Sequence, residues 1–215
     1  MPDGRHGSPR RVAAFDLDGT LTRRDCVTPF LRRVAGARLW RTLVTHLPAV
    51  AGAAAHRDRD RLKELAVLAL RGHEAAEVDR LGRSFADQVA QTWLRNDTVA
   101  RLAWHREAGD ATVVVSASLE CYVRPLGLLL GVDHVIATRL EADADGVLTG
   151  RLDGANCRGQ EKARRLTAWL DERGLEWAEL WAYGDSAGDE QLLALADIPV
   201  WVRGVEIDVV PAGRD

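Results

Sequence analysis

Lysine is scarce in this sequence: only two, Lys63 and Lys162, occur among 29 basic residues. The basic residues are outnumbered by 32 acidic ones, which gives a net charge of −3. The composition therefore lacks the basic excess that is typical of nucleic-acid-binding proteins, and we expect no nucleic-acid partner. Because the chain almost always chooses arginine, each lysine is informative where it occurs.

Cysteine is also scarce, with Cys26, Cys121 and Cys157 as the only three. An odd number without a CxxC pair argues against a disulfide framework and against a structural zinc site. Three reduced thiols are typical of a cytoplasmic protein, and a cytoplasmic location is our expectation.

Long apolar runs are missing as well. Residues 1–10 are polar and lack the apolar core of a signal peptide, so we expect a disordered leader. The longest apolar stretch, residues 39–55, is interrupted by Arg41, His46 and Pro48, and is too short and polar for a membrane-spanning helix. Trp40 and the run after it could line a substrate pocket or touch a membrane surface. We interpret them as packing among helices, and expect no membrane contact.

The 215 residues are 47% hydrophobic and 28% charged, which suits one α/β domain or a core domain with a smaller insert. Short apolar runs at 12–15, 112–115 and 180–183 predict buried strands, and each is followed by polar residues. Further patterns predict a strand at 132–140, a hairpin turn at 143–146 that leads to residue 152, helices at 160–173 and 189–195, and a last strand at 199–202.

Residues 29–109 have a different pattern, with apolar stripes at helical spacing. We therefore predict a parallel-sheet core over 11–28 and 110–215, and an all-helical domain over 29–109 that is inserted after the first strand. Arg61, Lys63 and Arg71 in this insert could reach an anionic group, but we interpret each as a solvated helix charge.

The candidate chemistry lies where three predicted strands end. Asp16 and Asp18, Ser116, and Asp185 follow these strands, and the carboxyl ends of parallel strands share one crevice. Clustered carboxylates repel one another unless a cation such as Mg²⁺ lies between them, and Lys162 at a helix start suits a phosphoryl group. A carboxylate can attack phosphorus, while a second one protonates the leaving oxygen.

Four segments together resemble the motifs of the haloacid dehalogenase (HAD) superfamily. They are the sequence DLDGTLT at 16–22, Ser116 after its apolar strand, Lys162, and the sequence GDSAGD at 184–189. The resemblance extends from about residue 12 to 202. It implies a Rossmann-like core, with the helical insert as a type I cap. The segment SASLECYVRPLG, the hairpin that ends in TGRLDG and the lysine that follows are similar to subfamily IB, which contains phosphoserine phosphatase.

The resemblance implies roles for the carboxylates. Asp16 is expected to be the nucleophile and a Mg²⁺ ligand. Asp18 is expected to be the general acid and base, with its backbone carbonyl on the metal. Asp185 is expected to ligate the metal, and Asp189 to bind it through water or to pair with Lys162. An aspartate at the position of Asp18 points to phosphatases and phosphomutases within the family.

Phosphate binding is expected from Ser116, the N–H of Ala117, and Lys162. Three features depart from phosphoserine phosphatases, which usually have Ser-Gly-Gly from the position of Ser116, asparagine at that of Gly188, and a glutamate near that of Asp25 to read the substrate amine.

The sequence therefore predicts a magnesium-dependent phosphomonoesterase acting on a small phosphorylated, phosphoserine-like substrate, as a monomer or homodimer. A phosphotransferase or phosphomutase, a phospholipid head-group phosphatase and a non-catalytic phospholigand-binding protein remain alternatives.

Overall fold

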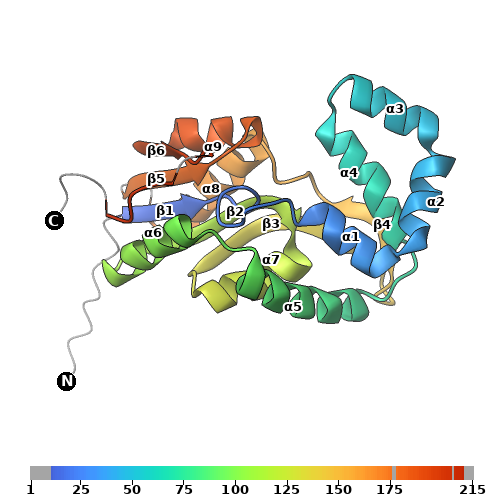
Figure 1. The fold of residues 1–215 in the computed structure, drawn as a ribbon, viewed down its shortest axis with the longest axis horizontal. Helices are drawn as coiled ribbons and strands as arrows, with labels where there is room; N and C mark the ends of the chain where they lie inside the picture. The colour runs from blue at the N-terminus through green and yellow to red at the C-terminus, as the bar shows by residue number, and fades with distance from the viewer. Residues whose placement is uncertain (1–10, 176–177, 205, 211–215) are drawn as a thin grey trace.

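The computed structural model describes residues 11–175, 178–204 and 206–210. Its centre is a six-stranded sheet in the order β4-β3-β2-β1-β5-β6 (Figure 1). All neighbouring pairs are parallel except β3 and β4, which are antiparallel. The strands are β1 (Arg11–Phe15), β2 (Ala111–Leu119), β3 (His134–Ala142), β4 (Leu148–Asp153), β5 (Glu179–Gly184) and β6 (Ile198–Trp201). The predicted leader, 1–10, lies outside the described residues.

The apolar run of β1 is buried on both faces because helices cover both sides of the sheet. Ala13 and Phe15 belong to one hydrophobic cluster, whereas Val12 and Ala14 belong to the other. The side chain of Phe15 stacks on that of Tyr183 with ring centroids 4.2 Å apart. This alternation holds β1 in the middle of the sheet, between β2 and β5.

The helices between β1 and β2 form the insert that the sequence predicts. They are α1 (Val27–Ala35), α2 (Ala37–Thr45), α3 (Leu47–Ala55), α4 (Arg59–Val67), the 3₁₀ turn η1 (Leu68–Leu70), α5 (Ala75–Thr92) and α6 (Asn96–Glu107). The later helices are α7 (Glu120–Leu130), α8 (Gln160–Glu172), the 3₁₀ turn η2 (Ala187–Asp189) and α9 (Glu190–Leu195). Over the described residues, no helix has both the length and the apolar character needed to cross a membrane.

The insert has two parts. Helices α2, α3 and α4 form a lobe that stands away from the sheet (Figure 1). By contrast, α5 packs along α7, and α6 contacts β2. The β3–β4 hairpin is joined to the insert by backbone bonds, with the N–H of Gly72 donating to Leu148 (2.8 Å) and that of Ala75 to Gly146 (2.8 Å). The domain boundary at residue 109 stays a prediction.

Candidate active site

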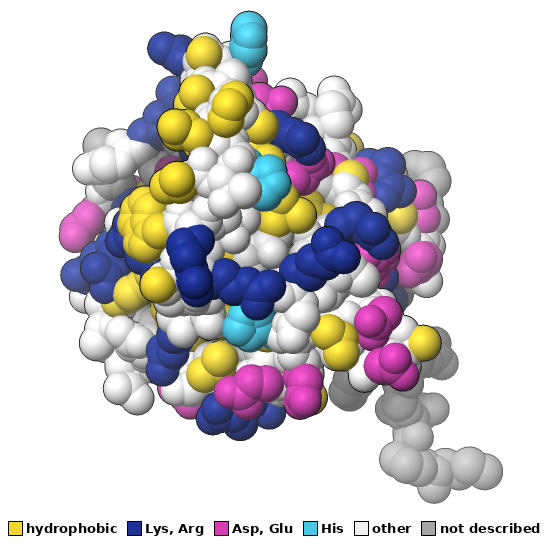
Figure 2. All heavy atoms as spheres, turned by 90° about the vertical axis from the view of Figure 1, so that its right-hand side faces the viewer, with side chains coloured by type: hydrophobic (Ala, Val, Ile, Leu, Met, Phe, Trp, Pro, Cys, Tyr) yellow, Lys and Arg dark blue, Asp and Glu magenta, His cyan; other side chains and the backbone are white. Residues whose placement is uncertain are grey.

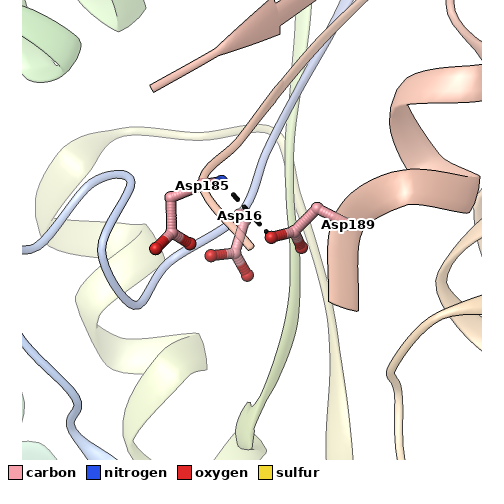
Figure 3. A group of neighbouring side chains, drawn as sticks. All are labelled: Asp16, Asp185 and Asp189. Atoms are coloured by element: carbon pink, nitrogen blue, oxygen red, sulfur yellow. Dashed lines mark hydrogen bonds between the residues drawn. The ribbon is translucent and has the colours of Figure 1, made fainter. Parts of the chain in front are cut away.

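Three carboxylates meet at the ends of adjacent strands. Asp16 directly follows β1, and its N–H continues the pairing with β5 by donating to the carbonyl of Tyr183 (2.9 Å). Asp185 directly follows β5, and Asp189 ends the turn η2. In Figure 3 the side chains of Asp16, Asp185 and Asp189 converge, and an oxygen of each lies within 4.8 Å of the others.

Lys162, on the first turn of α8, joins two of these carboxylates. Its ammonium donates to Asp16 and to Asp189, the latter at 2.5 Å, and only 2% of the residue is exposed. Burial alone would lower the pKa of Lys162, but Asp16 and Asp189 hold it above its usual value. The lysine is therefore a buried positive charge held between two carboxylates at the edge of the site.

Asp16 is itself difficult to ionise. Burial is the largest cause and raises its pKa to about 7. The attraction of Lys162 opposes this shift, and repulsion from Asp189 and Asp18 adds to it. Burial, followed by the Asp189 charge, also raises the pKa of Asp185. The site thus concentrates more negative charge than one lysine compensates, and this favours the binding of a cation.

Asp189 is fully engaged by protein donors. One oxygen accepts from Lys162, and the other accepts from the N–H (3.0 Å) and hydroxyl (2.9 Å) of Ser186. Burial opposes ionisation of Asp189, but Lys162 lowers its pKa overall. This side chain caps η2 and holds Lys162 in place.

Asp18 has a separate set of partners. It accepts hydrogen bonds from the hydroxyl of Ser118 and from the N–H of Cys26 (2.9 Å), and Ser118 in turn accepts from the hydroxyl of Tyr122 (2.7 Å). Burial raises the pKa of Asp18 to about 6. Neither Ser118 nor Tyr122 is among the site residues predicted from the sequence. The only available signal was the second serine of the Ser116-Ala117-Ser118 segment.

Gly19 is required by the turn that carries Asp18. Its φ of +85° disfavours residues with a side chain, and a Cβ here would lie 2.3 Å from a carboxylate oxygen of Asp185. The Asp-Gly pair of the first motif therefore brings the loop after β1 against the end of β5.

All the site residues predicted from the sequence line one open cavity of about 870 Å³. They are Asp16, Asp18, Asp25, Ser116, Ala117, Lys162, Asp185 and Asp189. Ser116 is buried, and its Oγ accepts from the N–H of Ser118 (3.0 Å). Asp25 is exposed, and its carboxylate accepts from the N–H groups of Val27 (3.3 Å) and Thr28 (3.1 Å) at the start of α1.

The prediction that Lys63 is a solvated helix charge is wrong. Lys63 is 9% exposed, and from α4 its ammonium reaches the carbonyl of Ala117 and the side chain of Asn156 (2.8 Å). Burial lowers its pKa to about 8, although the Asp18 charge opposes the shift. Both lysines of the chain thus line the same cavity. The rarity of lysine in the sequence could have identified Lys63 as a candidate site residue, but only Lys162 was predicted to be one.

The residues present fit a hard divalent cation. Over the described residues, Oδ1 of Asp185 is buried and has no hydrogen-bond partner, which leaves a carboxylate oxygen available to a ligand. Asp16 offers a second carboxylate, and oxygen donors in this number and charge suit Mg²⁺.

Comparison with known proteins agrees with this geometry. Residues 13–194 match the model of the haloacid dehalogenase-like hydrolase family. The chain is 40% identical over 196 residues to Protein CicA of Caulobacter vibrioides, a match that covers 90% of this chain and 86% of that protein. It is 38% identical over 102 residues to a histidinol-phosphatase of Neisseria meningitidis, a match that covers 46% of each.

The fold also matches a solved structure described as a phospho-aspartyl intermediate analogue of phosphoserine phosphatase. The TM-score is 0.61 at 20% sequence identity, over 88% of this chain and 84% of that one. The chain belongs to the haloacid dehalogenase-like hydrolase family. Within this family of hydrolases, its fold is shared with the phosphoserine phosphatase structure.

Proposed function

We propose that the protein is a Mg²⁺-dependent phosphomonoester hydrolase that works through an aspartyl-phosphate on Asp16. The observation that carries the proposal is the buried Asp16 at the end of the central strand, paired with Lys162 and facing the unpartnered oxygen of Asp185. The relatives named as phosphatases, and the structure described as a phospho-aspartyl analogue, support it.

Asp16 and Asp185 are the direct ligands that we propose for the metal, because both oxygens of Asp189 already accept from the protein. When bound, Mg²⁺ would neutralise negative charge on Asp16 and on the phosphoryl group. Asp189 then acts through Lys162, whose position it fixes. Of the two roles that the sequence analysis left open for Asp189, we therefore propose the pairing with Lys162.

The chemistry follows from the two carboxylates. An oxygen of Asp16 attacks phosphorus, and the bond from phosphorus to the alcohol oxygen breaks as Asp18 donates a proton to that oxygen. Asp18 then takes a proton from a water molecule, whose oxygen attacks the same phosphorus and releases phosphate from Asp16. A pKa of about 6 suits Asp18 to both steps near neutral pH, since both of its protonation states are accessible.

Lys162, the Ser116 hydroxyl and the N–H of Ala117 are the phosphate contacts that we propose. The lysine supplies a charge, and the other two supply oriented dipoles. All three residues line the same cavity as Asp16. Lys162 comes from α8, and Ser116 and Ala117 come from β2.

The test is phosphate release from a panel of phosphomonoesters with Mg²⁺, comparing the unmodified protein with Asp16→Asn. We expect the variant to lose at least about 10³-fold in kcat, because the nucleophile is removed while the fold is kept. Acid-stable labelling of the unmodified protein by ³²P-substrate, absent in the variant, would identify the phosphoenzyme. Equal turnover by both proteins would overturn the proposal. Labelling without phosphate release unless an alcohol is added would show a phosphotransferase instead.

A further inference from the structure

One wall of the cavity is apolar and comes from α1 and the lobe. Its side chains include Val27 and Leu31 of α1, and Leu39, Leu43, Val50 and Leu62 of the lobe helices. A volume of about 870 Å³ lies in the range of pockets that hold drug-sized ligands, which is far more than a phosphate group and a metal ion occupy. The polar floor therefore serves the phosphoryl group, and the apolar wall has to face the rest of the substrate.

Helix α3 is apolar and yet exposed. Its nine residues, LPAVAGAAA, contain no charged or hydrogen-bonding side chain, and only Ala53 is buried. Leu47 at its start is 58% exposed. A helix of this composition normally lies inside a protein or in contact with lipid.

Helix α2 has apolar side chains on two faces. Leu39 and Leu43 line the cavity, whereas Trp40 and Val44 point outward with 54% and 67% exposure. The sequence-based interpretation of Trp40 as packing among helices is therefore wrong. Figure 2 views the molecule from the lobe side and shows apolar side chains gathered on the lobe, with Lys and Arg side chains beside them.

The charged side chains of helices α1 to α3 and of the residue pair after α3 all have one sign. Residues 27–57 contain five arginines, Arg32, Arg33, Arg38, Arg41 and Arg57, and no acidic residue, although the whole chain carries −3. All five are exposed, and in the part of the chain that the structure describes none forms an ion pair. Two copies of such a surface would repel each other, so charge argues against self-association here and for an anionic partner.

We propose that the α2–α3 surface, defined by Trp40, Val44, Leu47 and the flanking Arg38 and Arg41, docks on an anionic lipid bilayer. The substrate is then a phosphomonoester of a lipid alcohol, whose chain lies along the apolar wall while its phosphate reaches Asp16. Exposed tryptophan and leucine beside arginines are the composition of interfacial membrane contacts. A surface contact of this kind requires no spanning helix.

The phosphoserine-like substrate that the sequence predicts has less support from this cavity. Apart from Asp16 and Asp18, Asp25 is the one acidic residue that the insert and the loop before it add to the lining, and its carboxylate accepts from the backbone of α1. No other carboxylate from that side is placed to read a substrate amine, over the described residues. The proposal rests on the phosphatase function proposed above, and it names the substrate class of the same site.

Binding is tested by co-sedimentation with vesicles of phosphatidylcholine alone and of phosphatidylcholine with phosphatidylglycerol. We expect the protein to bind only the anionic vesicles. Binding should weaken about fivefold for each of Arg38→Glu and Arg41→Glu, and more than tenfold for Trp40→Ser/Val44→Ser. The matched control is Leu128→Ser/Leu129→Ser on α7, which removes equally exposed apolar side chains elsewhere and should bind like the unmodified protein. Circular dichroism and melting temperature verify that each variant is folded.

The substrate class is tested with two phosphomonoesters that differ by one acyl chain, glycerol 3-phosphate and lysophosphatidic acid. We expect kcat/KM to be at least about 100-fold higher for the acylated compound, because each buried methylene contributes severalfold. Leu43→Asp should lower this ratio at least tenfold.

If Asp16-dependent release of phosphate occurs, but the ratio is near one and no vesicles bind, the inference is wrong while the phosphatase function stands. If no phosphomonoester releases phosphate, both are wrong. Dissociation of a dimer by Trp40→Ser/Val44→Ser would instead assign the surface to a second copy.

Discussion

Lys162 stabilises a site that would otherwise repel itself. Asp16 and Asp189 approach it from two different elements, and all three side chains are almost fully buried. Removing one partner of a buried ion pair is strongly destabilising because the remaining charges lose both water and compensation. The same residue is thus needed for stability and for the proposed chemistry.

The first prediction concerns Lys162→Met. In EDTA at pH 8 the variant should lose about 3 kcal/mol or more of unfolding free energy, because two buried carboxylates are left uncompensated. Asp16 has a raised pKa in the fold, about 7 compared with 3.8 for an ordinary aspartate. Without Lys162 this pKa rises further, so Asp16 is protonated in the variant at a higher pH than in the unmodified protein. Its part of the deficit should therefore shrink as the pH falls from 8 to about 7.

Urea unfolding at pH 8, 6.5 and 5 measures this deficit. The double variant Asp16→Asn/Lys162→Met is the control, since it removes one of the stranded carboxylates and should regain part of the loss at pH 8. A deficit that is independent of pH would show that Lys162 stabilises the protein through packing rather than charge.

The residues that the sequence identified are those whose position follows directly from a strand. Asp16 and Asp185 directly follow β1 and β5, and Ser116 lies in β2 three residues before its end, so topology alone brings them into one cavity. Lys63 could not be placed in this way. Its direction depends on how α4 is oriented over the sheet, and that orientation is set by contacts among insert helices that no local pattern encodes.

At the scale of elements, helices α5 and α7 approach each other closely. A Cβ at Gly82 would lie 2.2 Å from the carbonyl oxygen of Cys121. The two backbones can approach this closely because Gly82 has no side chain. Sequence patterns marked α5 as amphipathic, but they did not identify its partner.

The second prediction follows from this contact. Gly82→Ala should lower the free energy of unfolding by about 1–3 kcal/mol, because α5 must shift away from α7 to admit the methyl group. Gly52→Ala is the matched control. Gly52 also lies inside a helix, α3, but a Cβ there meets nothing within 4 Å. Its replacement should stabilise by about 0.5–1 kcal/mol. Chemical denaturation of both variants measures the difference, and equal signs would contradict the packing argument.

Most strands and the later helices begin and end near their predicted bounds, because apolar runs bounded by Gly and Asp are strong local signals. The helix predicted at 189–195 is α9 (Glu190–Leu195), but the 3₁₀ turn η2 (Ala187–Asp189) that precedes it was not predicted. That turn depends on Asp189, whose side chain accepts from the N–H and hydroxyl of Ser186. The sequence also does not predict the backbone hydrogen bonds between the β3–β4 hairpin and Gly72 and Ala75. These residues are far apart in the sequence, and tertiary packing decides whether they meet.

At the scale of the whole molecule, Lys63 links the lobe to the core. From α4 it donates to the carbonyl of Ala117 in β2 and to Asn156, and Asn156 donates back to Asp60 at the start of α4 (2.6 Å). This small network holds the lobe over the carboxylates, and a lobe that opened would have to break it.

The third prediction tests that link. Lys63→Met should increase amide hydrogen exchange in α3 and α4 severalfold, while exchange in β1 and β5 stays unchanged, because only the attachment of the lobe is weakened. Arg61→Met, on the same helix, is the control. Its guanidinium pairs with Glu64 at the surface, and such pairs contribute little. Faster exchange throughout the molecule, or none in the lobe, would contradict the assigned link.

The position of β1 in the sheet has a consequence for the order in which the protein is made. Val12 pairs with Ala111 and Leu180, so β1 gains its first neighbour only after the whole insert has been synthesised, and its second only after β5 has followed. Asp16 also meets Lys162, Asp185 and Asp189 late, because all three come after β2 in the chain. The nascent chain can therefore form lobe helices early, but the candidate site is incomplete until residue 189 has left the ribosome.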